Sequence, residues 1–245
     1  NKEGFGDEGN AIYNSGYQIY ALLLTLSSIG VPNAVSKLVS ERISVGNYKG
    51  AHRIFKIALI TFAIIGLIGA GILFFGAGTI ARFNGIPEAE LTLVALSPSI
   101  FFVAIISVFR GYFNGRASIK TTANSQTLEQ LFKTLFTILV VEMIGMHTGL
   151  NTTLMAAGAN LATTLAIISS FIYLCVYFRI YRKQIGNEIL QSTTVNNKDK
   201  SILQIVKNIL FVSIPMSLSS ILSSINKNVD ASTVDRNNQT ITAYD

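Results

Sequence analysis

The chain has 245 residues, of which 50% are hydrophobic and 13% are charged, and its formal net charge is +6. Soluble domains carry about a quarter charged residues, so this composition excludes a disordered chain and indicates that much of the surface faces something other than water. The single cysteine, Cys175, excludes a disulfide framework and a cysteine-built zinc site.

Apolar segments long enough to cross a bilayer recur along the chain. A hydrocarbon core about 30 Å thick requires about 20 helical residues. These segments do not alternate polar with apolar residues, as membrane β-strands do. We therefore expect an all-α, polytopic membrane protein with about six transmembrane helices, near residues 11–31, 57–81, 91–113, 127–146, 152–178 and 204–226.

The basic residues between these spans predict their orientation. Fifteen Lys and Arg residues lie in the connections 32–56, 110–133 and 179–207, whereas Arg82 is the one basic residue in the connections 82–90 and 147–151. The positive-inside rule places the fifteen on the cytoplasmic side. The first span then starts outside, so we expect an earlier span and a longer protein. The basic excess is thereby explained, and no nucleic-acid partner is predicted.

The chain is expected to divide at a polar stretch. Residues 184–201 are polar and separate two long apolar spans, which is typical of a linker. We predict an N-terminal helical bundle over 1–178, a cytoplasmic linker over 179–203, and the first helix of a second, truncated bundle over 204–245.

Two spans carry polar residues on one face. Their spacing by three, four or seven residues aligns the side chains of each set. At membrane depth such side chains face a partner helix or a water-filled cavity, and both interpretations stay open, although a terminal cation favours a cavity for the second set. The first set is Asn14, Gln18, Thr25 and Ser28, and the second is Ser213, Ser217, Ser220, Ser224 and Lys227.

Charged residues within two other spans need partners or access to water. Glu129 and Lys133 are four residues apart with the acid first, so they are predicted to form a helix ion pair. The alternative is a location near the cytoplasmic interface with the Lys133 amine extended toward water. Arg110, at the inner end of its span, either meets an anionic head group or anchors the topology.

Helix-breaking residues occur inside the spans. Pro98 and Pro215 are expected to kink or locally open their helices, as transporters require where a helix bends. The glycine-rich run between Gly66 and Gly78 superficially matches a dinucleotide-binding fingerprint. No strand is predicted before it and the spacing is wrong, so we predict close helix packing instead.

Residues typical of catalysis are few. His52 and His147 are predicted on opposite sides of the membrane, so they cannot share a metal site. Ser224 and Lys227 match a serine–lysine nucleophile pattern, but they lie at the end of a span without the accompanying motifs. We therefore predict no enzyme, no catalytic residue and no metal site.

Three segments, 6–56, 109–133 and 213–234, carry a family resemblance. The first contains GYQIYALLLTLSSIGVPNAVSKLVSERISVGNYKGAHRIFK, the second is FRGYFNGRASIKTTANSQTLEQLFK, and the third is SIPMSLSSILSSINKNVDASTV. In this order they resemble the stage V sporulation protein B type of polysaccharide biosynthesis protein. That family belongs to the multidrug, oligosaccharidyl-lipid and polysaccharide exporter (MATE-like) superfamily, which also includes the lipid II flippases.

The resemblance implies about twelve to fourteen spans in two six-helix bundles that face each other across a central cavity. This chain would supply helices two to seven, without the first helix and most of the second bundle. Both polar sets would then lie on cavity-lining helices. The cavity arginines of the peptidoglycan flippase branch are not carried over, because residues 11–31 contain no charge. The sequence after Val234 also departs from the family pattern.

We expect a flippase of the bacterial cytoplasmic membrane that moves a lipid-linked glycan to the outer leaflet. The polar sets would bind the sugar, and Lys227 with Arg110 would offset diphosphate charge. No cofactor is predicted, and the coupling cation stays open. The expected partners are the lipid-linked glycan and membrane lipids. The alternatives are a multidrug antiporter of the same superfamily, a membrane glycan transferase or polymerase, and a structural membrane subunit.

Overall fold

The structure is a computed structural model in which residues 13, 30–83, 85–148, 151–192, 201–215 and 217–219 are described. All regular structure in these residues is helical. The helices are α2 (Val31–Ser44), α3 (Tyr48–Phe83), α4 (Glu90–Gly115), α5 (Ile119–Thr148) and α6 (Thr152–Leu190), with a short 3-10 turn at Pro87–Ala89 and a further helical segment over Ile202–Ser219.

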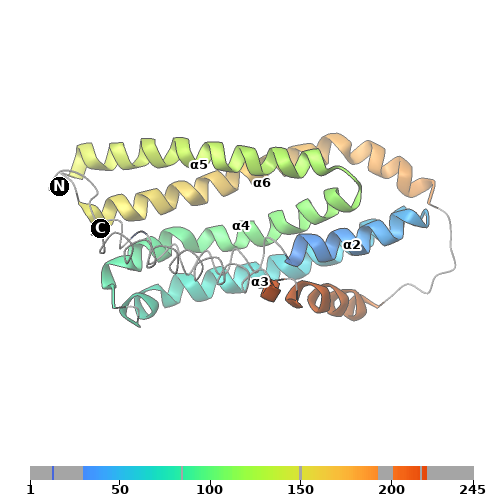
Figure 1. Cartoon of the computed structure of the whole chain (residues 1–245), viewed down its shortest axis with the longest axis horizontal. Coiled ribbons are helices and arrows are strands. Elements are labelled where there is room, and N and C mark those ends of the chain that lie inside the picture. Colours follow the sequence, from blue (N-terminus) through green and yellow to red (C-terminus); the bar gives the residue numbers. More distant parts are fainter. Residues whose placement is uncertain are drawn as a thin grey trace, which may run out of the picture.

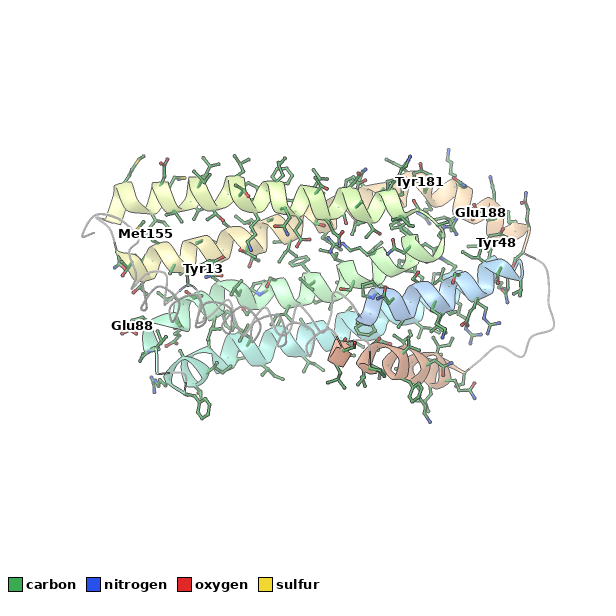
Figure 2. All side chains as sticks on the ribbon, in the orientation of Figure 1. Tyr13, Tyr48, Glu88, Met155, Tyr181 and Glu188 are labelled. Atoms are coloured by element: carbon green, nitrogen blue, oxygen red, sulfur yellow. The ribbon has the colours of Figure 1, made fainter. Side chains whose placement is uncertain are left out.

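The long helices lie side by side as an antiparallel bundle (Figure 1). α5 packs along α6, α6 packs on α4, and α4 packs on both α3 and α2. Figure 2 shows Tyr48 and Glu188 at one end of the bundle, and Glu88 and Met155 at the other. The first end carries the connections predicted to be cytoplasmic, and we refer to it as the cytoplasmic end.

In the part of the chain that the structure describes, four helices are long and apolar enough to cross a membrane: α3, Pro87–Gly115, α6 and Ile202–Ser219. They contain the predicted spans 57–81, 91–113 and 152–178 and the described part of 204–226. The predicted span 127–146 lies within α5, which is long enough but more polar than these four. The predicted span 11–31 falls almost entirely outside the described residues.

Residues 32–56, predicted as a connection between spans, are helical apart from a short turn. α2 occupies Val31–Ser44, α3 begins at Tyr48, and the break is confined to the turn between them, where Gly46 has a φ of +73°. The reason is amphipathic spacing. Val31, Val35, Leu38 and Val39 are buried on one face of α2, while Lys37 is exposed on another.

α6 continues as a helix to Leu190, beyond the predicted span. Its start is fixed by Asn151, whose side-chain oxygen accepts a hydrogen bond from the amide of Leu154 at 3.2 Å. The first part of the predicted 179–203 linker is therefore helical. The separation of two bundles by this linker stays a prediction.

Glycines set the closest helix contacts. A Cβ added to Gly66 would lie 2.8 Å from that of Ala104, and one added to Gly111 would lie 2.7 Å from that of Val35. α4 therefore approaches α3 and α2 at distances that a larger side chain would prevent. This confirms the predicted packing role for Gly66. Gly71, by contrast, meets nothing within 4 Å.

Pro98 lies inside α4, and the helix continues through it. Proline has no amide hydrogen, so the carbonyl of Val94, four residues earlier, loses its usual donor. The Ser97 hydroxyl donates to that carbonyl at 2.8 Å. The next carbonyl, that of Ala95, accepts from the Thr164 hydroxyl of α6 at 2.7 Å. Side chains thus satisfy the backbone where proline weakens the helix.

Candidate functional site

A buried polar site joins α4, α5 and α6 in the cytoplasmic half of the bundle. Arg110 projects from α4 and is 8% exposed. Its guanidinium donates to Glu129 Oε2 at 2.7 Å, to Ser125 Oγ at 3.0 Å and to Ser170 Oγ at 3.2 Å. One cation is therefore held by two neighbouring helices through three charge-assisted hydrogen bonds, one to a carboxylate and two to hydroxyls.

The same site also binds backbone groups. The Ser170 hydroxyl donates to the carbonyl of Ser125 at 3.1 Å, and the Ser125 hydroxyl donates to the carbonyl of Thr122 at 2.8 Å. The Thr122 hydroxyl in turn donates to Asn114 Oδ1 at 2.7 Å. The Ser170–Ser125 bond joins α6 to α5, and the Thr122–Asn114 bond joins α5 to α4, so these two bonds fix the register of α5 against its neighbours. The Ser125–Thr122 bond lies within α5.

The structure corrects the predicted Glu129–Lys133 pair. Glu129 forms its ion pair with Arg110 on another helix, not with Lys133 one turn along its own helix. An ion pair between α4 and α5 neutralises two charges in the low-dielectric interior, whereas pairing within α5 would have left Arg110 uncompensated. Lys133 is partly buried on α5.

Arg110 is also not placed as an open cation for a diphosphate group. The carboxylate of Glu129 already balances its charge, and neighbouring hydroxyls occupy further donors. Sequence analysis missed Ser125 and Ser170 as partners. The Arg110–Glu129 pair itself could have been predicted, because an arginine within the membrane requires an acidic partner and the following span contains Glu129.

Two members of the second polar set lie at a helix contact. Ser213 and Ser217 are buried, and both lie against Gly30 at the start of α2. The Ser213 hydroxyl donates to the carbonyl of Ile209, in the preceding turn, at 2.6 Å. For these serines the structure favours helix packing, the first of the two interpretations.

The remaining predicted site residues lie outside the described part of the chain. They are Asn14, Gln18, Thr25, Ser28, Ser220, Ser224 and Lys227. Tyr13, which is described, packs against an apolar cluster at the end of the bundle opposite the cytoplasmic end, made by Leu73, Ala77, Ala81, Ala89, Leu93 and Ala156. This location matches the predicted start of the first span on the outer side.

A second ion pair closes the cytoplasmic end. Arg116, in the turn after α4, pairs with Glu188 near the end of α6. Its guanidinium also lies 5.4 Å from the centre of the Tyr112 ring, within the range of a cation–π contact. The Tyr112 hydroxyl lies 3.5 Å from Nδ1 of His52 on α3. This contact set ties α3, α4 and α6 together at the cytoplasmic end of the bundle.

Within the described residues, no three His, Cys, Asp or Glu side chains gather as a metal site requires. The chemistry that the described side chains offer consists of hydrogen bonding and charge neutralisation. These functions suit binding and helix association.

Comparison with known proteins identifies the family. The model of the family described as "Polysaccharide biosynthesis protein" matches residues 5–235. The chain belongs to this family. It is 30% identical over 223 residues to stage V sporulation protein B of Bacillus subtilis (strain 168), covering 90% of this chain and 41% of that relative. It is also 30% identical over 195 residues to lipid II flippase MurJ of the same strain, covering 74% of this chain and 35% of that protein.

Solved structures confirm the MATE-like fold. A MATE transporter crystal structure superposes with a TM-score of 0.74 at 19% identity, covering 91% of this chain and 48% of that one. A multidrug resistance MATE family transporter matches in its outward-facing form with a TM-score of 0.70 and in its inward-facing form with 0.73. This protein is thus a multi-pass membrane protein. The chain spans less than half the length of these relatives.

Proposed function

We propose that the complete protein is a flippase that moves a lipid-linked glycan across the bacterial cytoplasmic membrane. The observation that carries the proposal is the combination of the polysaccharide biosynthesis family with a transporter fold. The relative named as a lipid II flippase supports the same class of substrate. Transfer of a sugar head group through hydrocarbon is costly because its polar groups lose their hydrogen bonds. Protein groups that replace those bonds lower the cost without covalent chemistry.

Alternating access is the proposed mechanism. This half of the molecule fits the outward-facing and inward-facing transporters about equally well, with TM-scores of 0.70 and 0.73. Such similarity is expected if one bundle moves as a unit against the other. The contacts of Arg110 with α5 and α6 would keep that unit intact during the movement.

A multidrug antiporter is the second candidate, because the solved structures that share the fold include multidrug transporters. Cationic drugs require carboxylates or aromatic faces within a cavity. Glu129 is already paired with Arg110, so it offers such a drug no open carboxylate. The pairing of Glu129 thus removes one candidate carboxylate for such a drug.

The test uses the full-length protein in proteoliposomes that contain a fluorescent lipid-linked disaccharide in both leaflets. A membrane-impermeant quencher reports movement between leaflets. We expect movement above that of protein-free liposomes, and we expect Lys227→Ala to slow it, with Arg182→Ala on the exposed end of α6 as the matched control. Absence of movement together with proton-coupled export of a cationic dye would support the antiporter instead. Movement that does not depend on Lys227 would leave the function in place and remove this cation from the path.

A further inference from the structure

Two fully buried side chains in the outer half of the bundle each carry an oxygen without a hydrogen bond. They are Thr92 on α4 and Asn160 on α6. Within the part of the chain that the structure describes, neither Thr92 Oγ1 nor Asn160 Oδ1 has a hydrogen-bond partner. A buried polar atom that forms no hydrogen bond costs free energy, so these two oxygens indicate a ligand that bonds to them.

The Thr92 hydroxyl differs from other buried hydroxyls of the same helix. The Ser99 hydroxyl donates to the carbonyl of Leu96. The Ser107 hydroxyl donates to the carbonyl of Val103 at 2.8 Å. Such bonds to the preceding turn are the usual way in which a hydroxyl inside a helix is satisfied. Thr92 does not use it, so its hydroxyl stays available to a group outside α4.

The amide of Asn160 is held in one orientation. Its Nδ2 donates to the carbonyl of Ala156, one turn earlier on α6, at 3.1 Å. The amide oxygen is therefore the atom that stays open, and it can only accept a hydrogen bond. Any group that satisfies this oxygen must be a donor.

These two side chains lie at the same level of the contact between α4 and α6. Both helices run from the outer end of the bundle to the cytoplasmic end (Figure 1). On the cytoplasmic side, the Thr164 hydroxyl bonds to the carbonyl of Ala95 at 2.7 Å. On the outer side, Ala156 and Ala89 belong to the same buried cluster. The α4 threonine is midway between Ala89 and Ala95, and the α6 asparagine is midway between Ala156 and Thr164.

The two side chains also lie on the facing sides of their helices. Ala95, Phe102 and Phe109 of α4 all contact α6. Thr92 precedes Ala95 by three residues, so it continues this face of α4. Asn160 lies one turn before the α6 hydroxyl that bonds to Ala95, so it continues the facing side of α6.

The chemistry of the pair indicates a neutral ligand. Water can donate to Asn160 Oδ1 and accept from the Thr92 hydroxyl, and buried water in proteins has two to four polar partners of this kind. A buried cation would require a neighbouring acid. Glu90, the acid nearest to Thr92 in the sequence, is directed to another helix, because a Cβ on Gly78 of α3 would lie 3.0 Å from its carboxylate.

We propose that a water molecule binds between Thr92 and Asn160 and links α4 to α6 in the outer half of the bundle. In the cytoplasmic half, Arg110 links the same two helices by donating to Ser170. The pair of helices is thus joined by polar contacts in both halves of the membrane. The outer contact carries no charge, so it needs no ion pair of the kind that Arg110 requires.

The test is a crystal structure of the full-length protein, at a resolution that resolves ordered water, from crystals grown in rubidium chloride. We expect one peak of density about 2.5–3.0 Å from both oxygens, without the anomalous signal of rubidium. A rubidium signal would show a cation site and overturn the proposal. A direct bond between the two side chains, or a protein group bonded to either oxygen, would overturn it as well. The wild-type structure alone decides these outcomes.

Paired substitutions provide a second readout. Thr92→Val with Asn160→Leu should remove the peak, whereas Ser99→Ala, which removes a hydroxyl bonded within its own helix, should keep it. Each single substitution should lower the melting temperature in detergent, because it leaves the other oxygen buried with fewer bonds. The double variant should melt at a higher temperature than either single one. Additive losses would show that the two side chains do not share a ligand.

Discussion

Replacing Glu129 with leucine removes the carboxylate that binds Arg110 and leaves the guanidinium buried beside the Ser125 and Ser170 hydroxyls. Breaking one partner of a buried ion pair costs about 3–5 kcal/mol, because the remaining charge has no compensation. The side chains are 10% and 17% exposed for Arg110 and Glu129. Since Glu129 retains some exposure, we expect a loss near the lower limit, about 3 kcal/mol.

The double variant Arg110→Met with Glu129→Leu should recover most of this loss. Neither charge is then buried, and apolar replacement of a buried pair is often neutral or stabilising. Ser125 and Ser170 keep their bonds to the carbonyls of Thr122 and Ser125, so no new unsatisfied hydroxyl is created. The expected coupling between the two positions is about 2–3 kcal/mol.

The assay is reversible unfolding of the purified full-length protein in mixed detergent micelles, followed by far-ultraviolet circular dichroism as the denaturing detergent fraction rises. Arg182→Ala, on the exposed part of α6, is the control, and we expect it to change the unfolding free energy by less than about 0.5 kcal/mol. The reasoning is refuted if Glu129→Leu is as stable as the wild type. It is equally refuted if the double variant is no more stable than the single one.

Three further predictions use the same preparation. Gly111→Ala places a Cβ against Val35 and should lower the free energy of unfolding by about 1–3 kcal/mol. Gly71→Ala, whose Cβ meets no atom within 4 Å, should leave the free energy of unfolding unchanged or slightly higher. Equal effects of the two substitutions would contradict the packing role of Gly111. Ser97→Ala should lower the free energy of unfolding by about 1 kcal/mol, because the carbonyl of Val94 then has no hydrogen-bond donor. An unchanged free energy of unfolding would exclude this role for Ser97. Arg116→Ala should increase hydrogen exchange of the amides near the end of α6, and equal exchange along the whole helix would indicate a global rather than a local effect.

The membrane spans were predictable because the thickness of the bilayer sets the length of each apolar segment and the distribution of Lys and Arg between the segments indicates their orientation. The predicted span 91–113, for example, falls inside α4 with a margin of two residues or fewer at each end. The helical nature of 32–56 was harder to predict. The mean hydropathy of this segment is lowered by charged residues such as Lys37 and Lys49, and an average does not reveal the apolar face that is buried on the other side of the helix.

The partner of Glu129 could not be obtained from local spacing. Within one helix, a residue four positions away is the natural partner, and this favoured Lys133. Arg110 lies nineteen residues away in sequence and reaches Glu129 only after α4 and α5 fold back on each other. The packing role of Ser217 against Gly30 has the same cause, since it joins segments far apart in the chain.

The polar character of α5 has a consequence for how the protein enters the membrane during synthesis. A charged residue within an inserting helix opposes integration, most strongly near the helix centre, and the predicted span in α5 contains Glu129, Lys133 and Glu142. α4 leaves the ribosome first, so Arg110 is already present to neutralise Glu129 when α5 arrives. The integration of α5 thus depends on a helix synthesised before it, and a truncated chain that lacks α4 should leave α5 outside the bilayer.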